Sequence, residues 1–344
     1  MISSSRTLAI VGVTVSFALV TGCGGGHKSA PTPTSTQSST SPSPTPTTSA
    51  PAADRVNPFT GLAYVNNAVV AVKIDDTGNG RPQRGINQAD IVYVEEVEGG
   101  LTRLLAVFNT TLPTVEPVRS TRANDPELLG QYGPIAYVAS GGAPNPLSIL
   151  DRSPLRSSIN DRGGPGFVRD PNRPAPYNLL SDLAAEARAV HGGPAKSIGL
   201  TFVSATNPAL AGSSALTVRT EVGATAIRFD WNGSLKRYVR VIDGVLQHDS
   251  AGQVVATRNV IVQFCKITPY PADIDVNGNP AAYTHSIGSG RAVVFSNGHM
   301  INGRWNRPSS ASGTSFTTNG GTPIPLLTGG EWVILVATNA PLSS

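Results

Sequence analysis

Residues Tyr93 to Arg122 read YVEEVEGGLTRLLAVFNTTLPTVEPVRSTR, and the rest of the chain is organised around this stretch. Two apolar runs flank Gly99-Gly100, a pair that suits a two-residue β-hairpin turn because both positions must reach a positive φ. Counted outward from that turn, Glu96 opposes Arg103. Side chains alternate along a strand, so Glu96, Glu98 and Arg103 are expected on one face. The sequence therefore predicts a charged site at the tip of a hairpin.

Two further arginines follow the hairpin. Arg119 and Arg122 lie in PVRSTR, and a Ser140-Gly-Gly loop comes after the next apolar run. Guanidinium groups and bare backbone N–H groups are the donors that a carboxylate, phosphate or sulfate needs. The alternative is internal pairing of these arginines with nearby carboxylates. The candidate ligand-binding residues are Glu98, Arg103, Arg119, Arg122, Asp75 and Glu96.

The carboxylates also allow a different class of function. Two of them could form the acid–base pair that glycoside hydrolysis requires, but sequence fixes no distance between them. The histidines show no paired ligand spacing, so we expect no metal site. The Gly-rich stretches are not followed by Gly-Lys-Ser/Thr, and there is no G-x-S-x-G elbow. We therefore expect no cofactor, and the catalytic residues, if there are any, stay unknown.

Composition limits the partners. The chain has 344 residues, of which 14% are charged, with 36 glycines and 28 prolines. The formal net charge of +4 is too small and too scattered to favour nucleic acid as a partner. A turn-rich, strand-rich protein is expected.

The N-terminus reads as a lipoprotein signal peptide over residues 1–22. Arg6 supplies the positive charge, and Leu8 to Val20 form an apolar segment too short for a comfortable membrane span. The segment ends in Val-Thr-Gly-Cys, so Cys23 is the expected site of acylation (diacylglycerol and palmitate). The alternative is an ordinary secretory signal with a chance cysteine. Residues 23–54 are rich in Pro, Ser and Thr, which predicts a disordered tether.

This reading places the folded part outside the cell, on the outer face of the cytoplasmic membrane, with the membrane reached through the N-terminal lipid.

Two folded segments follow the tether. Residues 55–200 mix apolar runs with helical spacing, which predicts an α+β or α/β domain; the expected strands are Val69–Ile74, Ile91–Val94 and Ile135–Ala139, and the expected helices are Asp125–Gln131 and Asn178–His191. Residues 194–215 are expected to link the segments. Residues 215–340 predict a β-rich domain, a sandwich or half-barrel, with strands at Ala226–Trp231, Lys236–Ile242, Val254–Ile267, Arg291–Phe295 and Trp332–Ala337.

Several motifs together resemble the YerB-like family of bacterial lipoproteins, whose two conserved regions are domains of unknown function. The shared motifs are Asn57-Pro58-x-Thr60-Gly61-Leu62, Arg81-Pro82-Gln83, Gln88-Ala89-Asp90-Ile91-Val92-Tyr93, Glu98-Gly99-Gly100-x-Thr102-Arg103, Pro117-Val118-Arg119-Ser120-x-Arg122, Gly141-Gly142, Tyr238-Val239-Arg240, Asn259-Val260-x-Val262-Gln263, Gly303-x-Trp305 and Gly330-Glu331-Trp332. The resemblance implies a location and an architecture, and it implies no reaction.

The chain departs from that family pattern at two positions. Glu116 stands where the family has Gly, and Tyr177 stands where it has His. If that histidine is catalytic elsewhere, Tyr177 puts catalysis in doubt here.

The sequence thus favours an envelope protein that binds an anionic small molecule, a cell-wall component or an envelope protein. An envelope hydrolase acting on cell-wall or glycan substrates, and a structural or assembly lipoprotein without a ligand, are the alternatives.

Overall fold

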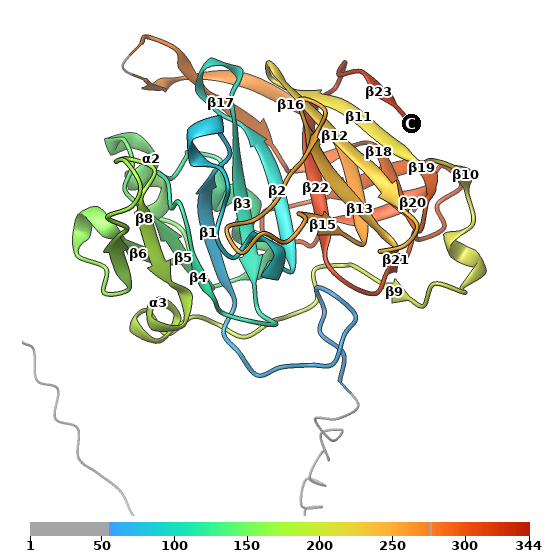
Figure 1. Cartoon of the computed structure of the whole chain (residues 1–344), viewed down its shortest axis with the longest axis horizontal. Coiled ribbons are helices and arrows are strands. Elements are labelled where there is room, and N and C mark those ends of the chain that lie inside the picture. Colours follow the sequence, from blue (N-terminus) through green and yellow to red (C-terminus); the bar gives the residue numbers. More distant parts are fainter. Residues whose placement is uncertain (1–54, 276) are drawn as a thin grey trace, which may run out of the picture. The chain divides into compact units, whose positions relative to one another are not determined.

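One mixed β-sheet carries strands from both sequence segments (Figure 1). The computed structural model describes residues 55–275 and 277–344, so the predicted signal peptide, Cys23 and the tether lie outside the described residues. The sheet has twelve strands in the order β10-β19-β18-β16-β22-β2-β3-β1-β5-β6, with β17 paired to β16 and β20 paired to β19. Their bounds are β1 Val70–Asp75, β2 Ile91–Glu96, β3 Thr102–Phe108, β5 Ala136–Ala139, β6 Arg156–Ile159, β10 Ser213–Ser214, β16 Asn259–Ile274, β17 Pro280–His285, β18 Gly288–Ser296, β19 His299–Arg307, β20 Ser315–Thr318 and β22 Glu331–Ala337.

Strand β22 joins the two segments. It comes from the end of the chain, yet it lies between β2 and β16 and runs parallel to both. The segments predicted at 55–200 and 215–340 are therefore connected by backbone hydrogen bonds within one sheet. The residue limits of the two predicted domains stay a prediction.

A second sheet of six strands has the order β14-β13-β12-β11-β23, with β15 paired to β13. Its bounds are β11 Thr217–Val222, β12 Thr225–Asn232, β13 Arg237–Ile242, β14 Val245–Leu246, β15 Ala256–Thr257 and β23 Leu342–Ser343. It packs on the large sheet through aromatic contacts, with ring centroids 5.4 Å apart for Phe229 and Trp332 and 6.3 Å apart for Tyr238 and Phe295. The prediction of a β-rich second segment is confirmed.

Two small sheets complete the strands of the described residues. Strand β21 Leu326–Leu327 pairs with β9 Phe202–Val203, and β8 Leu179–Asp182 pairs with β4 Thr114–Val115 and β7 Phe167–Arg169. Short 3₁₀ turns occur at η2 Gly78–Gly80, η3 Ile86–Gln88, η4 Glu98–Gly100, η5 Gly130–Tyr132, η6 Asn160–Arg162 and η7 Pro208–Leu210.

Three α-helices accompany the strands of the first segment: α1 Asp125–Leu129, α2 Pro144–Asp151 and α3 Leu183–Ala189. Figure 1 shows α2 and α3 near the β5–β6 end of the large sheet. Leu128 and Leu129 of α1 pack into the core on one face of the sheet, while Leu183 and Ala187 of α3 pack into the core on the other. Because both faces are covered, all six residues of β1 are buried, which explains its nearly continuous apolar sequence.

The predicted helix Asn178–His191 is only half correct. Its first part is strand β8, and the helix begins after Asp182, whose carboxylate accepts hydrogen bonds from the amides of Ala184 and Ala185. The leucines at the start satisfy helical spacing, but pairing with β7 and β4 overrides that local preference.

Candidate functional site

The predicted hairpin exists, with β2 and β3 as its strands. Its turn is longer than the predicted two residues, because the amide of Val97 donates to the carbonyl of Leu101 at 2.8 Å. Gly99 and Gly100 adopt φ of 65° and 70°, the left-handed region that glycine enters without a steric penalty.

The longer turn changes the pairing of the strands. Glu95 opposes Arg103, and Glu96 opposes Thr102. The predicted register, with Glu96 opposite Arg103, is therefore wrong by one residue, and a one-residue slip moves side chains to the other face. Glu96 does not share a face with Arg103. Its carboxyl instead lies beside Gly223, where a Cβ would be 2.9 Å from it.

The turn is enclosed by elements of the second segment. The carbonyl of Gly100 accepts hydrogen bonds from the amide of Ala224 at 2.8 Å and from the hydroxyl of Thr225 at 3.1 Å. On its other side, Gly99 lies near Asn279, in the turn that connects β16 to β17. Figure 1 shows the tip of the β2–β3 hairpin beside β17. Both segments therefore build the surroundings of the predicted site.

A buried ionic group lies below the hairpin tip. The ammonium of Lys73, on β1, contacts the carboxylates of Glu95 and Asp125, the latter at 2.6 Å. The hydroxyl of Tyr137 donates to Asp125 at 2.6 Å. Burial raises the pKa of Glu95, although Lys73 acts against the rise. Lys73 and Asp125 were not predicted as site residues. A lysine inside the apolar run VAVKID was the one available signal, since a lysine is almost never buried unless it is paired.

Two of the predicted arginines have internal partners. Nε of Arg119 lies 2.8 Å from Asp75, and Nε and Nη2 of Arg122 each lie 2.6 Å from an oxygen of Glu98. Burial opposes the ionisation of Glu98, but the hydrogen bond and charge of Arg122, together with the charge of Arg103, outweigh burial and hold the pKa of Glu98 below its ordinary value.

Arg103, the third predicted arginine, lacks a hydrogen-bond partner for one of its nitrogens within the part of the chain that the structure describes. Its side chain is 12% exposed, and its nearest carboxylate oxygen, on Glu98, lies 4.0 Å from Nη1. Nη1 is buried and has no hydrogen-bond partner among the described residues. Burial, together with the positive charges of Arg122 and Arg119, lowers the pKa of Arg103 to about 9. Because the described residues offer Nη1 of Arg103 no acceptor within hydrogen-bond distance, this guanidinium can still donate to an anion.

Asp273 is an acidic neighbour that sequence reasoning missed. It lies on β16, is 6% exposed, and its Oδ2 has no hydrogen-bond partner within residues 55–275 and 277–344. Burial raises its pKa, while the charges of Arg122 and Arg103 act to lower it and that of Glu98 adds to the rise. It stands more than 150 residues along the chain from those arginines, so no local pattern could have identified it.

A second buried ion pair lies next to the cluster. Arg240, on β13, donates to both oxygens of Asp76 at 2.7 Å, and its guanidinium lies 5.0 Å from the ring centroid of Trp332. The hydroxyl of Thr102 also donates to Asp76 at 2.8 Å. Asp76 thus connects the first segment to the second sheet, and both of its carboxylate oxygens accept hydrogen bonds.

Each of the two positions that depart from the family pattern contacts an arginine. The guanidinium of Arg119 is 5.3 Å from the ring centroid of Tyr177, and Arg119 donates weakly to the carbonyl of Pro176 at 3.4 Å. Glu116 pairs at 3.3 Å with Arg173, which lies in the same β7–β8 loop as Tyr177. Tyr177 therefore contributes a cation–π contact at the rim of the arginine cluster, where a histidine would offer a titratable group.

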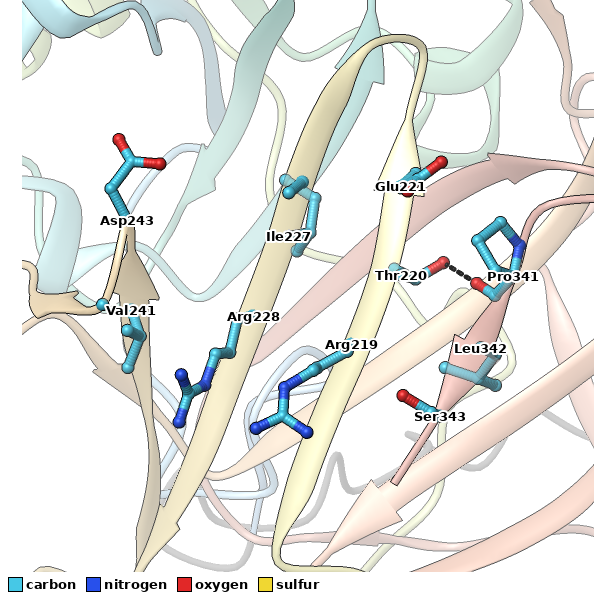
Figure 2. Close-up of a pocket in the computed structure, with 12 residues that line it drawn as sticks. Arg219, Thr220, Glu221, Ile227, Arg228, Val241, Asp243, Pro341, Leu342 and Ser343 are labelled. Carbon is cyan, nitrogen blue, oxygen red and sulfur yellow. Dashed lines mark hydrogen bonds between the residues drawn. The ribbon is translucent and has the colours of Figure 1, made fainter.

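The structure also has open cavities away from the arginine cluster. One of about 440 Å³ crosses the second sheet, lined in part by Arg219, Arg228 and Asp243 (Figure 2). The figure shows the two arginines on neighbouring strands, and Thr220 bonded to the carbonyl of Pro341 at 2.7 Å. None of the predicted site residues lines this cavity.

Among residues 55–275 and 277–344, no group of three or more His, Cys, Asp or Glu side chains is arranged to hold a metal ion. No helix within the described ranges has the length and apolar character needed to cross a bilayer.

Comparisons with known proteins give the relationships of the chain. Two family models match it: the DUF3048 N-terminal domain over residues 59–193 and the DUF3048 C-terminal domain over residues 216–333, both from a protein of unknown function. A Bacillus subtilis (strain 168) protein described as "Putative lipoprotein YerB" is 27% identical over 293 residues, which cover 81% of this chain and 85% of that protein.

A solved structure agrees with these matches. The crystal structure of the YerB protein from Bacillus subtilis is 24% identical, superposes with a TM-score of 0.71, and covers 84% of this chain and 100% of its own. At this identity the likeness establishes a shared fold.

Proposed function

This chain belongs to the DUF3048 family of proteins of unknown function, and from that premise we propose that it is a lipid-anchored envelope protein that binds an anionic or polar ligand through Arg103, Arg119 and Arg122. The anchor would be Cys23, and the folded part would stand on the outer face of the cytoplasmic membrane. The similarity to a protein described as a putative lipoprotein supports this location. The ligand would be a small anion, or a carboxylate- or phosphate-bearing group on a cell-wall component or an envelope protein.

One observation carries the binding proposal: Nη1 of Arg103 is buried without a hydrogen-bond partner among the described residues. Arginine has no neutral state to adopt at physiological pH, so a buried guanidinium must meet an anion, another acceptor or water. Leaving such a group unpaired costs the full desolvation penalty. An anion that reaches Arg103 would recover that cost.

Access to the cluster supports the same proposal. The side chains of Arg119, Arg103 and Arg122 keep 19%, 12% and 10% of their surface exposed, so solvent reaches these side chains although Nη1 of Arg103 itself is buried. The ion pairs with Asp75 and Glu98 fix the first and last of these arginines in place. A ligand would then meet a preorganised set of donors, which lowers the cost of binding.

The hydrolase alternative gains no support from these contacts. Asp75 is held by Arg119, Asp76 by Arg240, and Glu98 by Arg122. A general acid needs a raised pKa, whereas the pKa values of Asp76 and Glu98 are lowered. Burial raises the pKa of Glu95 and of Glu96, but Glu95 is enclosed in the core against Lys73, and Glu96 lies on the other face of the hairpin from Arg103. The purely structural alternative accounts for Arg119 and Arg122 and leaves Arg103 unexplained.

A binding measurement tests the proposal. Isothermal titration of the mature protein in detergent with sodium acetate, phosphate and sulfate should detect at least one of these anions. Arg103→Gln should weaken that binding about 10- to 100-fold, since a charged hydrogen bond contributes roughly 1.5–3 kcal/mol. Arg304→Gln, at an exposed position on β19, is the matched control and should leave the affinity unchanged.

Thermal melts of the same variants separate binding from structural support. Arg103→Gln should keep or raise Tm, because it removes an unsatisfied buried charge. A large fall in Tm, or equal anion affinity in Arg103→Gln and the wild type, would contradict the proposal.

A further inference from the structure

Two buried groups of opposite charge near the hairpin tip have neither a hydrogen-bond partner nor a close ion-pair contact among the described residues: Nη1 of Arg103 and Oδ2 of Asp273. Nε of Arg119, Nε of Arg122 and Oδ2 of Asp75 also lack hydrogen-bond geometry, but they lie in ion pairs of 2.8 Å and 2.6 Å.

Arg103 and Asp273 belong to one neighbourhood: Ile274, next to Asp273, pairs with Pro280, and the preceding residue Asn279 lies beside Gly99 of the hairpin turn. The charges of Arg103 and Arg122 accordingly act on Asp273. Within the described part of the chain, however, no salt bridge joins Asp273 to either arginine, and the one carboxylate close to Arg103 is that of Glu98 at 4.0 Å. A donor and an acceptor are therefore held near each other without contact.

The backbone of β16 explains why Asp273 points inward. From Tyr270 to Ile274 this strand advances four residues, while its partner β17 advances only from Ala281 to Pro280. The strand therefore contains an irregularity that includes Asp273. A bulge of this kind redirects side chains, and bulges are over-represented next to functional sites. Here Asp273 is 6% exposed, while Ile274, its apolar neighbour, is 55% exposed. The exposure of the apolar residue and the burial of the charged one reverse the usual preference.

The energetics favour a ligand that satisfies both groups. An anion alone would pair with Arg103 but would also approach the carboxylate of Asp273. A cation alone would pair with Asp273 but would approach three guanidinium groups. A molecule that carries both charges removes both desolvation penalties and avoids both repulsions.

We propose that the site takes a zwitterionic ligand of the α-amino acid type, with its carboxylate on Arg103 and its ammonium group on Asp273. This inference rests on the proposed function and names the ligand class for the same site. Free amino acids and short peptides both carry this chemistry, and they differ in the separation of the two charges.

The test compares ligands that differ by one charge. Titrations of the mature protein use L-alanine, D-alanine and alanylalanine, with propionate lacking the ammonium group and ethylamine lacking the carboxylate. At least one zwitterion should bind 10-fold or more tightly than either single-charge compound. Preference for alanine indicates a free amino acid, and preference for alanylalanine indicates a peptide. Both results support the inference.

The variant Asp273→Asn should remove the advantage of the zwitterion over propionate and leave propionate binding unchanged or tighter. Asp151→Asn, in an exposed pair with Arg162 on the surface, is the matched control and should change nothing. A melt of Asp273→Asn verifies folding. If that variant does not fold, the ligand series on the wild type alone decides the question.

The outcomes separate the inference from the proposed function. If propionate binds the wild type as tightly as every zwitterion, and Arg103→Gln weakens it, anion binding stands and the zwitterion inference is overturned. If no compound binds and acetate, phosphate and sulfate also fail, both are overturned.

Discussion

Glu331 carries a carboxyl group that is buried in the core. Its carboxyl is 1% exposed, and neither oxygen has a hydrogen-bond partner among the described residues. It borders a small enclosed cavity of about 10 Å³, with Tyr93, Gln131 and Gln263 among the other lining residues. Burial, with a contribution from Asp90, raises the pKa of Glu331 well above its ordinary value of 4.5. The folded protein therefore favours the protonated form.

This pKa shift predicts a pH dependence of stability. A pKa that is raised in the folded state contributes stability at low pH. This contribution to the free energy of unfolding is complete below the unfolded-state pKa, about 4.5, and is lost as the pH rises through the folded-state pKa. Glu331→Gln should therefore raise Tm at pH 8, by roughly 2–4 °C for each 1 kcal/mol regained, and should change it little at pH 5. Thermal melts across this range, with the exposed Glu221→Gln as the control, measure the difference in slope. Parallel curves for Glu331→Gln and the wild type would refute the assignment.

At the level of elements, the β2–β3 turn depends on one close approach. Gly99 and Gly100 both have positive φ, but their surroundings differ. A Cβ on Gly99 would meet Asn279 at 3.8 Å, an ordinary contact, whereas a Cβ on Gly100 would lie 2.8 Å from the backbone nitrogen of Ala224. The β11–β12 turn therefore packs directly against Gly100.

The two neighbouring glycines give a matched pair of substitutions. Gly99→Ala should cost about 1–2 kcal/mol, the penalty of the left-handed conformation alone. Gly100→Ala should cost more, because the second turn must also move away. Chemical denaturation of both variants measures the difference. Equal losses of unfolding free energy would mean that the contact with Ala224 contributes nothing.

The sequence predicted some elements well and others poorly, for physical reasons. The strand at 69–74 and the interior strand at 91–94 were recovered because both faces of the sheet are covered and their residues are accordingly apolar. The hairpin was predicted, but its register was not, because Gly-Gly suits longer turns as well as a two-residue one. Helix α2 was missed, since Pro144–Asp151 shows few apolar residues at helical spacing.

At the scale of the whole molecule, the site depends on pairings between distant residues. The Gly and Arg motifs of the first segment indicated where charge gathers, and Arg119, Arg122, Glu98 and Asp75 do come together there. The sequence could not show that β22 lies between β2 and β16, nor that β13 brings Arg240 to Asp76. These contacts are set by tertiary packing, which no local pattern in a single sequence encodes.

The second segment therefore does more than stabilise the first. The amide of Ala224, in its β11–β12 turn, donates to the carbonyl of Gly100. Arg240, on its strand β13, pairs with Asp76, and its strand β16 carries the buried Asp273. The described residues, 55–275 and 277–344, belong to one compact unit, in agreement with this shared construction.

The most direct test of the proposed binding site is a crystal structure of residues 50–344 soaked in sodium acetate. We predict an acetate whose carboxylate oxygen lies about 2.7–2.9 Å from Nη1 of Arg103, the distance typical of a charged hydrogen bond. The contacts of Arg119 with Asp75 and of Arg122 with Glu98 should persist. A structure without acetate at this position, in which Arg103 pairs directly with Asp273 or Glu98, would contradict the proposal.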